Sequence, residues 1–181
     1  MIMLKQLLKN KFQIERMLNN MKIEQAKISD ASKIVDININ EWINTYTGIF
    51  PTDFLKKLKN KKEESIEKCK NKINEYVVCK IDNQVIGFLR YGKNKKGYSD
   101  EYCEIYSLYI DKNYQHKGIG SDLIAYAFEI LKSQYKYVLI STLVQNSANE
   151  FYQKIGGELL KQIDFKLESN VYQENLYLFT L

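Results

Sequence analysis

Several residue types are scarce in this chain of 181 residues, which contains one proline, one histidine and three cysteines. A single histidine excludes a multi-histidine metal site, and Cys69, Cys79 and Cys103 lack zinc-binding spacing. An odd number of scattered cysteines favours a reduced, intracellular protein. No apolar run approaches the ~18 residues of a membrane-spanning helix, and the N-terminus lacks the apolar core of a secretory signal. We therefore expect a cytoplasmic protein that binds neither metal nor membrane.

The net charge of +5 comes mostly from lysines that are spread along the chain. Nucleic-acid binding is a weaker interpretation of this charge, because no compact arginine-rich stripe is present. The length and a hydrophobic content of 45% predict one domain, over residues 21–181. Residues 1–20 stand apart as an N-terminal extension, which is either a helical arm or the product of a non-native start.

The remaining sequence alternates between predicted strands and helices. Strands are expected at 23–28, 76–81, 85–91, 103–110, 137–144 and 176–181, with Asp82-Asn83-Gln84 as a hairpin turn. Ser29-Asp30 should cap a helix that runs towards Tyr46, and a second helix should extend from 52 to about 71. A strand–helix–strand crossover requires a parallel neighbour. The predicted fold is α/β, of the α+β type: a mixed, mainly antiparallel sheet of six to seven strands with helices on both faces.

A glycine turn between a buried strand and an amphipathic helix is the most informative feature. Helix-spaced apolar residues follow Gly118 and Gly120, and the first amides of a helix have no intrahelical acceptor. Glycines allow a ligand to approach this backbone closely, so an anionic phosphate group is the predicted ligand. The spacing fits neither a Walker loop nor a dinucleotide-binding fingerprint.

Three segments, in order, resemble the GNAT superfamily of N-acetyltransferases, and the resemblance covers nearly all of the chain beyond the first twenty residues. The glycine turn, at 115–120, matches the Q/R-x-x-G-x-G/A signature of this superfamily. Residues 146–157 resemble its asparagine…Phe-Tyr…Gly segment. Residues 42–51 look like a W-x-x-x-Y-x-G-x-x-P segment of many bacterial members. Two departures are Gly157, where many members have phenylalanine, and Asn149, where small residues are frequent.

The resemblance implies acetyl-CoA as cosubstrate and two central parallel strands that splay apart to admit its pantetheine arm. The diphosphate of the cosubstrate would bind the glycine turn. The main chain at the end of the strand 103–110 would pair with the pantetheine arm, and Asn146 would hydrogen-bond the arm from the side opposite that strand. The cofactor-binding residues implied in this way are Leu108, Tyr109, Ile110, Gln115, His116, Lys117, Gly118, Ile119, Gly120, Ser121, Asn146 and Tyr152.

Acetyl transfer to an amine requires a base, an acid and an oxyanion donor, because a free alkylamine has a pKa of about 10. Glu104, on a central strand, is the candidate general base, although an outward-facing structural carboxylate is an equal alternative. Tyr152 is the candidate general acid, by its place in the resemblance, since a tyrosine stays protonated at neutral pH. A main-chain N–H near Tyr109 or Ile110 would stabilise the oxyanion.

The acceptor is expected to be a primary amine of a small molecule or peptide, acetylated directly in a ternary complex. Trp42, Tyr46 and Phe50 are candidate walls of the acceptor pocket, with core packing of an amphipathic helix as the alternative for Trp42. A catalytically silent acyl-CoA sensor or interaction module is the alternative function. The sequence leaves monomer and homodimer equally open.

Overall fold

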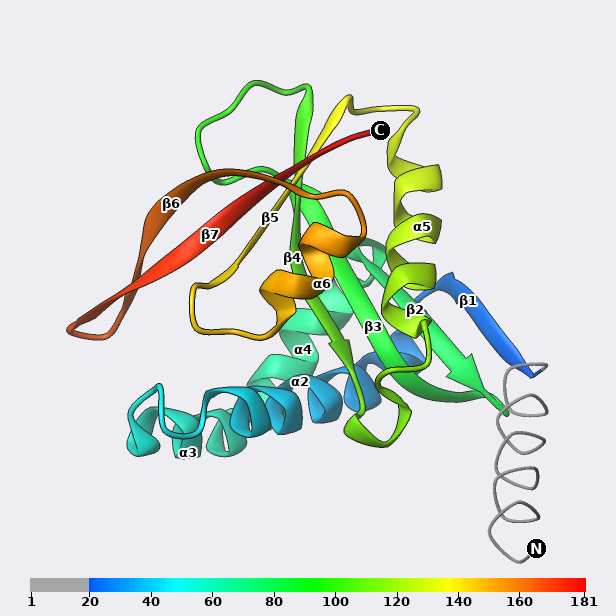
Figure 1. Cartoon of the computed structure of the whole chain (residues 1–181). Coiled ribbons are helices and arrows are strands. Elements are labelled where there is room, and N and C mark those ends of the chain that lie inside the picture. Colours follow the sequence, from blue (N-terminus) through cyan, green and yellow to red (C-terminus); the bar gives the residue numbers. More distant parts are fainter. Residues whose placement is uncertain (1–19) are drawn as a thin grey trace, which may run out of the picture.

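The computed structural model describes residues 20–181, so the expected arm at residues 1–20 lies outside the described residues except for Asn20. Seven strands form one sheet in the order β1-β2-β3-β4-β5-β7-β6 (Figure 1). They are β1 (Met21–Gln25), β2 (Tyr76–Ile81), β3 (Gln84–Lys93), β4 (Tyr102–Ile110), β5 (Tyr137–Leu143), β6 (Glu158–Leu167) and β7 (Asn170–Thr180). All neighbours are antiparallel except β4 and β5. The mixed, mainly antiparallel sheet predicted from the sequence is confirmed.

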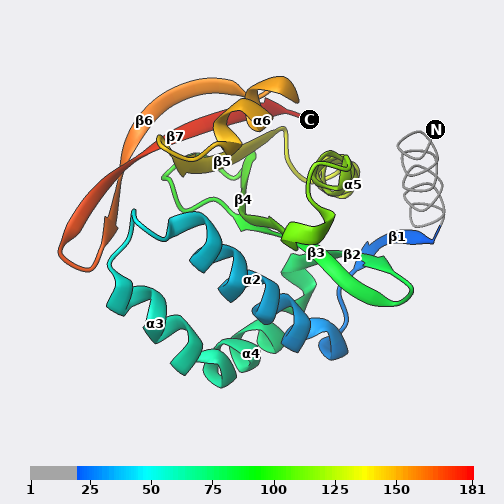
Figure 2. The same cartoon turned by 60° about the horizontal axis from the view of Figure 1, so that its bottom comes forward.

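Helices cover both faces of this sheet (Figure 2). One face carries α2 (Ala31–Tyr46), α3 (Thr52–Asn60) and α4 (Lys62–Asn71), and the other carries α5 (Ile119–Leu131) and α6 (Ala148–Lys154). Short 3₁₀ turns, η1 (Ile28–Asp30), η2 (Ile73–Glu75) and η3 (Lys112–Tyr114), join them to the strands. No helix of residues 20–181 is long and apolar enough to cross a membrane.

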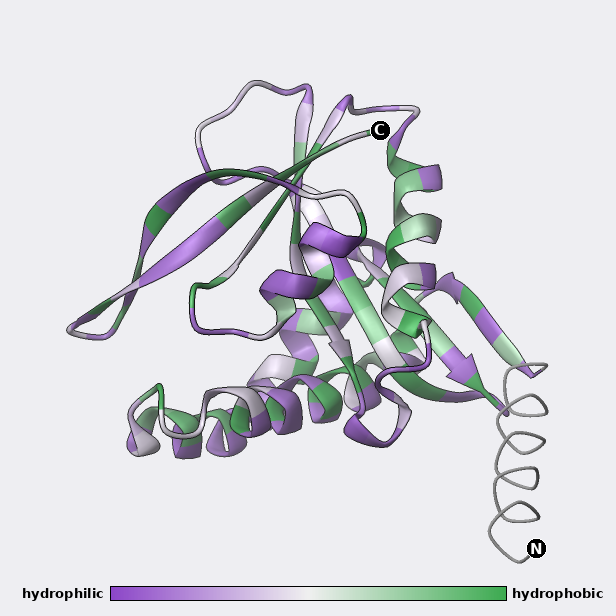
Figure 3. Ribbon diagram, viewed as in Figure 1, coloured by the Kyte–Doolittle hydropathy of each residue, from purple (hydrophilic) through white to green (hydrophobic). Residues whose placement is uncertain are grey.

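Apolar side chains on the two faces of the sheet build two cores. Strand β2 is buried along its whole length, with Val77 and Cys79 in the core beneath α5 and Val78 in the core beneath α2 and α4. The central strands are accordingly hydrophobic, whereas α2 and α3 alternate between hydrophilic and hydrophobic turns (Figure 3). Strand periodicity places alternate residues on opposite faces, and an apolar run therefore fits a strand covered on both sides.

Four local predictions were wrong. The first strand ends at Gln25 rather than Ile28, and a break at Lys61 divides the expected helix 52–71 into α3 and α4. Asp30 does not cap α2 with its side chain, because its carboxylate accepts from the Lys27 amide and pairs with Lys80. The last strand begins at Asn170 rather than Leu176, and it forms a long hairpin with β6.

Candidate active site

The parallel pair β4–β5 is joined over only part of its length. The strands pair from Tyr102–Tyr137 to Ile105–Ile140 and then separate, while β4 continues to Ile110 along β3 and β5 continues to Leu143 along β7. The backbone edge of β4 from Tyr106 to Ile110 therefore has no strand partner on the β5 side within residues 20–181. This separation confirms the splayed pair that the resemblance implied.

A bulge in β4 lies at the point where the two strands part. Opposite β3, Tyr91 faces Ile105 and Arg90 faces Ser107, so Tyr106 is an extra residue without a partner in the ladder. Such a bulge reverses the alternation of side chains between the two faces. Ile105 and Leu108 consequently both contribute to the core beneath α5, and Tyr109 faces the α2 side. The bulge thereby sets which side chains of 107–110 face α2.

The turn before α5 presents a continuous run of free main-chain amides. Asp122 donates to the Gly118 carbonyl, but the N–H groups of 115–121 have no acceptor within residues 20–181. Gly118 has φ +86° and His116 has φ +59°, so two residues of the turn adopt the left-handed conformation that orients these amides. Because the amides also begin a helix, the turn is suited to bind an anion.

Gln115 connects this turn to α2 rather than pointing its side-chain amide at a ligand. Its Nε2 atom donates to Oε2 of Glu41 at 3.0 Å and to the Ile110 carbonyl at 2.8 Å. The Glu41 carboxylate, which is 5% exposed, also accepts from the Lys112 amide at 3.3 Å. One buried carboxylate of α2 thus fixes both the end of β4 and the start of the turn. The sequence does not predict this contact, since no local pattern links residues 74 positions apart.

Three tyrosines from different elements surround the gap between β4 and β5. Burial raises the pKa of Tyr46, on α2, and the polar side chains of Tyr109 and Asn146 partly oppose that increase. Burial, followed by the proximity of Tyr46, raises the pKa of Tyr109 well above its ordinary value, and the same two causes raise that of Tyr152. All three hydroxyls are therefore protonated at neutral pH.

Tyr152 combines deep burial with a hydroxyl that has no hydrogen-bond partner within residues 20–181. The residue is 7% exposed and its ring packs against Phe151 and Tyr177. No side-chain polar atom that is fully buried within residues 20–181 lacks a partner, and the Tyr152 hydroxyl makes no hydrogen bond there. A bound molecule that accepts from this hydroxyl would therefore displace no hydrogen bond to residues 20–181.

Glu104 is buried on the face of the sheet opposite α5, one residue before the strands part. Its Oε2 atom accepts from the Lys95 amide at 2.9 Å, and its Oε1 atom lies 3.7 Å from the Lys96 ammonium. The same ammonium lies 3.7 Å from Glu174 of β7, whose side chain is 13% exposed. Glu174, a second carboxylate that sequence reasoning missed, also helps to raise the pKa of Tyr46, although burial is the main cause.

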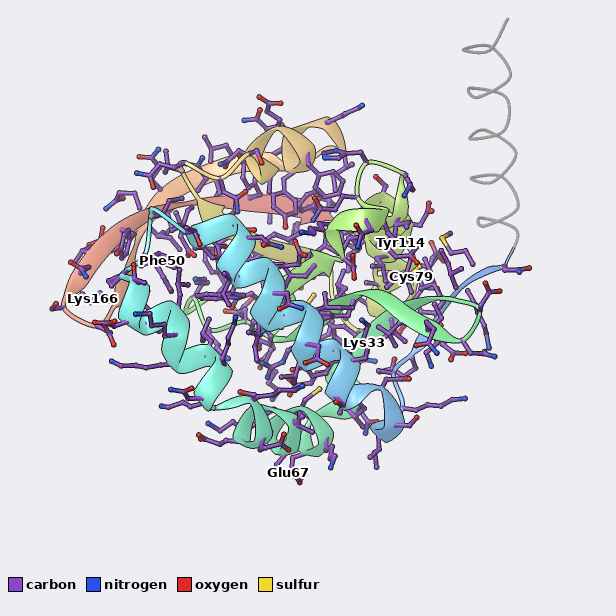
Figure 4. The ribbon with its side chains drawn as sticks, turned by 90° about the horizontal axis from the view of Figure 1, so that it is seen from below. Lys33, Phe50, Glu67, Cys79, Tyr114 and Lys166 are labelled. Atoms are coloured by element: carbon purple, nitrogen blue, oxygen red, sulfur yellow. The ribbon has the colours of Figure 1, made fainter. Side chains whose placement is uncertain are left out.

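The three predicted wall residues belong to one aromatic cluster on the α2 side. The rings of Trp42 and Tyr46 lie 5.0 Å apart, and those of Tyr46 and Phe50 stack at 4.6 Å. Phe50 lies where the segment after α2 meets the β6–β7 hairpin, and its ring is 4.8 Å from that of Tyr172 (Figure 4). Phe50 is 5% exposed and Tyr46 8%, so both also contribute to a core, against which Trp42 packs partly buried.

The two departures from the expected pattern have structural explanations. A Cβ atom on Gly157 would lie 2.7 Å from the Phe179 ring and 2.8 Å from the Tyr152 carbonyl, so β7 fills the space that a side chain would need. Asn149 donates to the carbonyls of Leu143, Val144 and Asn146. Its Oδ1 atom accepts from Asn175 and from the Tyr177 hydroxyl. Asn149 therefore holds Asn146 and the start of α6 against β5 and β7.

Comparisons with known structures agree with this geometry. The PaiA N-acetyltransferase of Thermoplasma acidophilum, in complex with coenzyme A, superposes with a TM-score of 0.68 at 22% identity, covering 86% of this chain and 97% of that one. YncA of Salmonella typhimurium, with acetyl-CoA, superposes with a TM-score of 0.67 at 17% identity, covering 89% of this chain and 94% of that one. This chain thus shares its fold with these two acetyltransferases.

The sequence comparisons identify the family. The model of the Acetyltransferase (GNAT) family matches residues 38–157, and the chain belongs to that family. YuaI of Bacillus subtilis strain 168, described as an uncharacterized N-acetyltransferase, is 26% identical over 149 residues, which are 80% of this chain and 84% of YuaI. The expectation of an acetyltransferase is confirmed.

We predict that Asn149→Ala destabilises the protein by about 1–3 kcal/mol, because it leaves the buried Tyr177 hydroxyl and the Asn175 amide without their acceptor. The free energy of urea-induced unfolding measures this loss. Asn60→Ala, at the exposed end of α3, is the matched control. Equal stability of the two variants would contradict the role given to Asn149.

Proposed function

We propose that this protein transfers the acetyl group of acetyl-CoA to a primary amine, directly and without an acyl-enzyme. The observation that carries the proposal is the run of acceptor-free amides at 115–121, which lies where the chain leaves the divided edge of β4. A diphosphate on these amides would place a thioester-bearing arm along that edge. The presence of coenzyme A and acetyl-CoA in two proteins of similar fold supports this donor.

The arm would lie between two sets of polar groups. The edge of β4 at Leu108–Ile110, which has no strand partner on the β5 side within residues 20–181, lies on one side of the arm. Asn146, whose position is fixed by Asn149, lies on the other. Main-chain N–H groups near Tyr109 would stabilise the oxyanion that forms when the amine attacks the thioester carbonyl. The diphosphate would use the backbone of 115–121, with His116 and Lys117 adding positive charge. Gln115 would contribute its backbone, since its side chain is bonded to Glu41 and Ile110.

Tyr152 is the proposed general acid. When the tetrahedral intermediate collapses, the C–S bond breaks and the CoA sulfur takes its electron pair as a thiolate. The Tyr152 hydroxyl would donate its proton to that sulfur, and burial, which raises its pKa, keeps the proton in place until then. The tyrosinate that results is strongly disfavoured by burial, so it would regain a proton as the product leaves.

Glu104 is the proposed general base, with Glu174 as a second carboxylate for the amine. An alkylammonium must lose a proton before it can attack, and Glu104 lies beside the gap on the α2 face. Lys96 bridges the two carboxylates at 3.7 Å to each, which is ion-pair distance rather than hydrogen-bond distance. The two carboxylates can therefore attract a cationic amine to the aromatic cluster of Trp42, Tyr46 and Phe50.

Tyr152→Phe should lower kcat for acetyl transfer by about 10²-fold or more while the affinity for CoA changes little, because only the proton donor is lost. Free-thiol release with a panel of amines gives kcat, and calorimetry gives the CoA affinity. Tyr126→Phe, on α5, is the matched control. Unchanged turnover in Tyr152→Phe would remove this residue from the mechanism.

Glu104→Gln should lower kcat/KM at neutral pH by about 10²-fold, and the loss should shrink at higher pH as the free amine loses its own proton. Glu174→Gln should instead raise KM for the amine with a smaller effect on kcat, because it removes attraction rather than the base. Complete pH–rate profiles separate the two effects. A Glu104→Gln profile that coincides with that of the wild type would exclude Glu104 as the base.

A further inference from the structure

A second cavity lies on the α2 side of the sheet, under α2 and α4. Its volume is about 510 Å³, which falls in the range of small-molecule sites. The side chains of Tyr76 and Phe88 contribute apolar lining, and Lys68, Lys72 and Arg90 contribute positive charge. No aspartate or glutamate of residues 20–181 lines it. The cavity thus combines aromatic surface with cations, and it lies on the face of the sheet opposite α5 and the amide turn.

Arg90 is held in a fixed position at this cavity. Its Nε and Nη2 atoms both donate to Oε2 of Glu75, at 3.0 and 2.8 Å, and its guanidinium lies 5.3 Å from the ring centre of Tyr76 and 5.2 Å from that of Tyr106. The Nη1 atom has no acceptor within residues 20–181. A guanidinium that is already ordered loses little conformational entropy when it binds an anion.

The charges around Arg90 leave a net positive site. Glu75 also pairs with Lys72 at 3.2 Å, so one carboxylate balances only part of the positive charge of Arg90 and Lys72. Lys68 pairs with Glu64 at the exposed surface of α4, where an ion pair is weak. An anion that enters the cavity would therefore contact the Arg90 guanidinium, whose charge Glu75 balances only in part, and the neighbouring Lys72.

The cavity also adjoins the strand proposed to receive the thioester. Arg90 faces Ser107, which lines the cavity and directly precedes Leu108–Ile110. The Phe88 ring lies 5.9 Å from that of Tyr109. A ligand in the cavity would be one aromatic ring away from the cluster of tyrosines.

We propose that this cavity binds a small carboxylate with an apolar or aromatic body, with the Arg90 guanidinium as its anchor. Nη1 and the side chain of Lys72 would contact the carboxylate, and Tyr76 and Phe88 would contact the body. The anion site itself does not depend on the proposed acetyl transfer. The carboxylate could belong to the acceptor amine or to a separate effector, and the two sources differ in their effect on the kinetics.

Calorimetry with benzoate, in the absence of acetyl-CoA, tests the site. Wild-type protein should bind benzoate, and Arg90→Lys should bind it about tenfold more weakly, because lysine lacks the planar fork. Glu75→Gln should bind it more tightly, since it removes the competing carboxylate. Lys57→Arg, which also exchanges one cation for another at a lysine that pairs with Glu168 away from the cavity, is the charge-matched control for Arg90→Lys and should behave as wild type.

Two results would overturn the proposal: absence of benzoate binding by the wild type, or benzoate affinities of Arg90→Lys and Glu75→Gln that both equal the wild-type value. The opposite signs expected for these two variants separate a direct effect from partial unfolding, which would weaken binding in both.

Acetylation kinetics identify the source of the carboxylate once benzoate binds. If the acceptor supplies it, 4-(aminomethyl)benzoate should have a higher kcat/KM than benzylamine, Arg90→Lys should remove the difference, and benzoate should compete with this acceptor. If an effector supplies it, benzoate should bind without raising the KM for either amine. The benzoate titration tests the anion site even if neither amine is acetylated, because it does not depend on turnover.

Discussion

The separation of β4 from β5 after Ile105–Ile140 is the constraint on which the rest of the structure depends. A parallel pair that continued to the ends of both strands would satisfy the backbone of β4 and close the sheet. Because the strands part, β4 keeps an unpaired edge, and Tyr46, Tyr109 and Tyr152 can approach one another through the gap. The separation removes backbone hydrogen bonds between β4 and β5. A ligand that hydrogen-bonds to the β4 edge in place of β5 is stabilised by those backbone groups.

Contacts distant in sequence hold the two sides of the gap. On the β4 side, Glu41 of α2 binds Gln115 and the Lys112 amide and so fixes the strand end together with the amide turn. On the β5 side, Asn149 bonds three carbonyls before α6 and accepts from β7. These buried polar groups are satisfied by one another, which makes each hard to replace. The opening is therefore built into the fold and does not need a ligand to create it.

Local signals explain which parts could be predicted from the sequence. The glycine turn, the Asp82-Asn83 hairpin with both residues at positive φ, and the central apolar strands each have their own pattern. Residues along β6 are mostly exposed, so this strand lacks the buried face that would mark its bounds in the sequence. Glu41, Glu174 and Asn149 act across long separations and carry no local signature. The second cavity is likewise assembled from α2, α4 and three strands.

The central claim is that the amides of 115–121 bind the diphosphate of coenzyme A, and calorimetry with CoA and with pantetheine tests it most directly. Pantetheine has the same arm but no diphosphate. The account predicts that CoA binds and that pantetheine binds at least about a hundredfold more weakly, because charge-assisted bonds to the turn are lost. Equal affinities of the two ligands, or no heat from CoA, would contradict it.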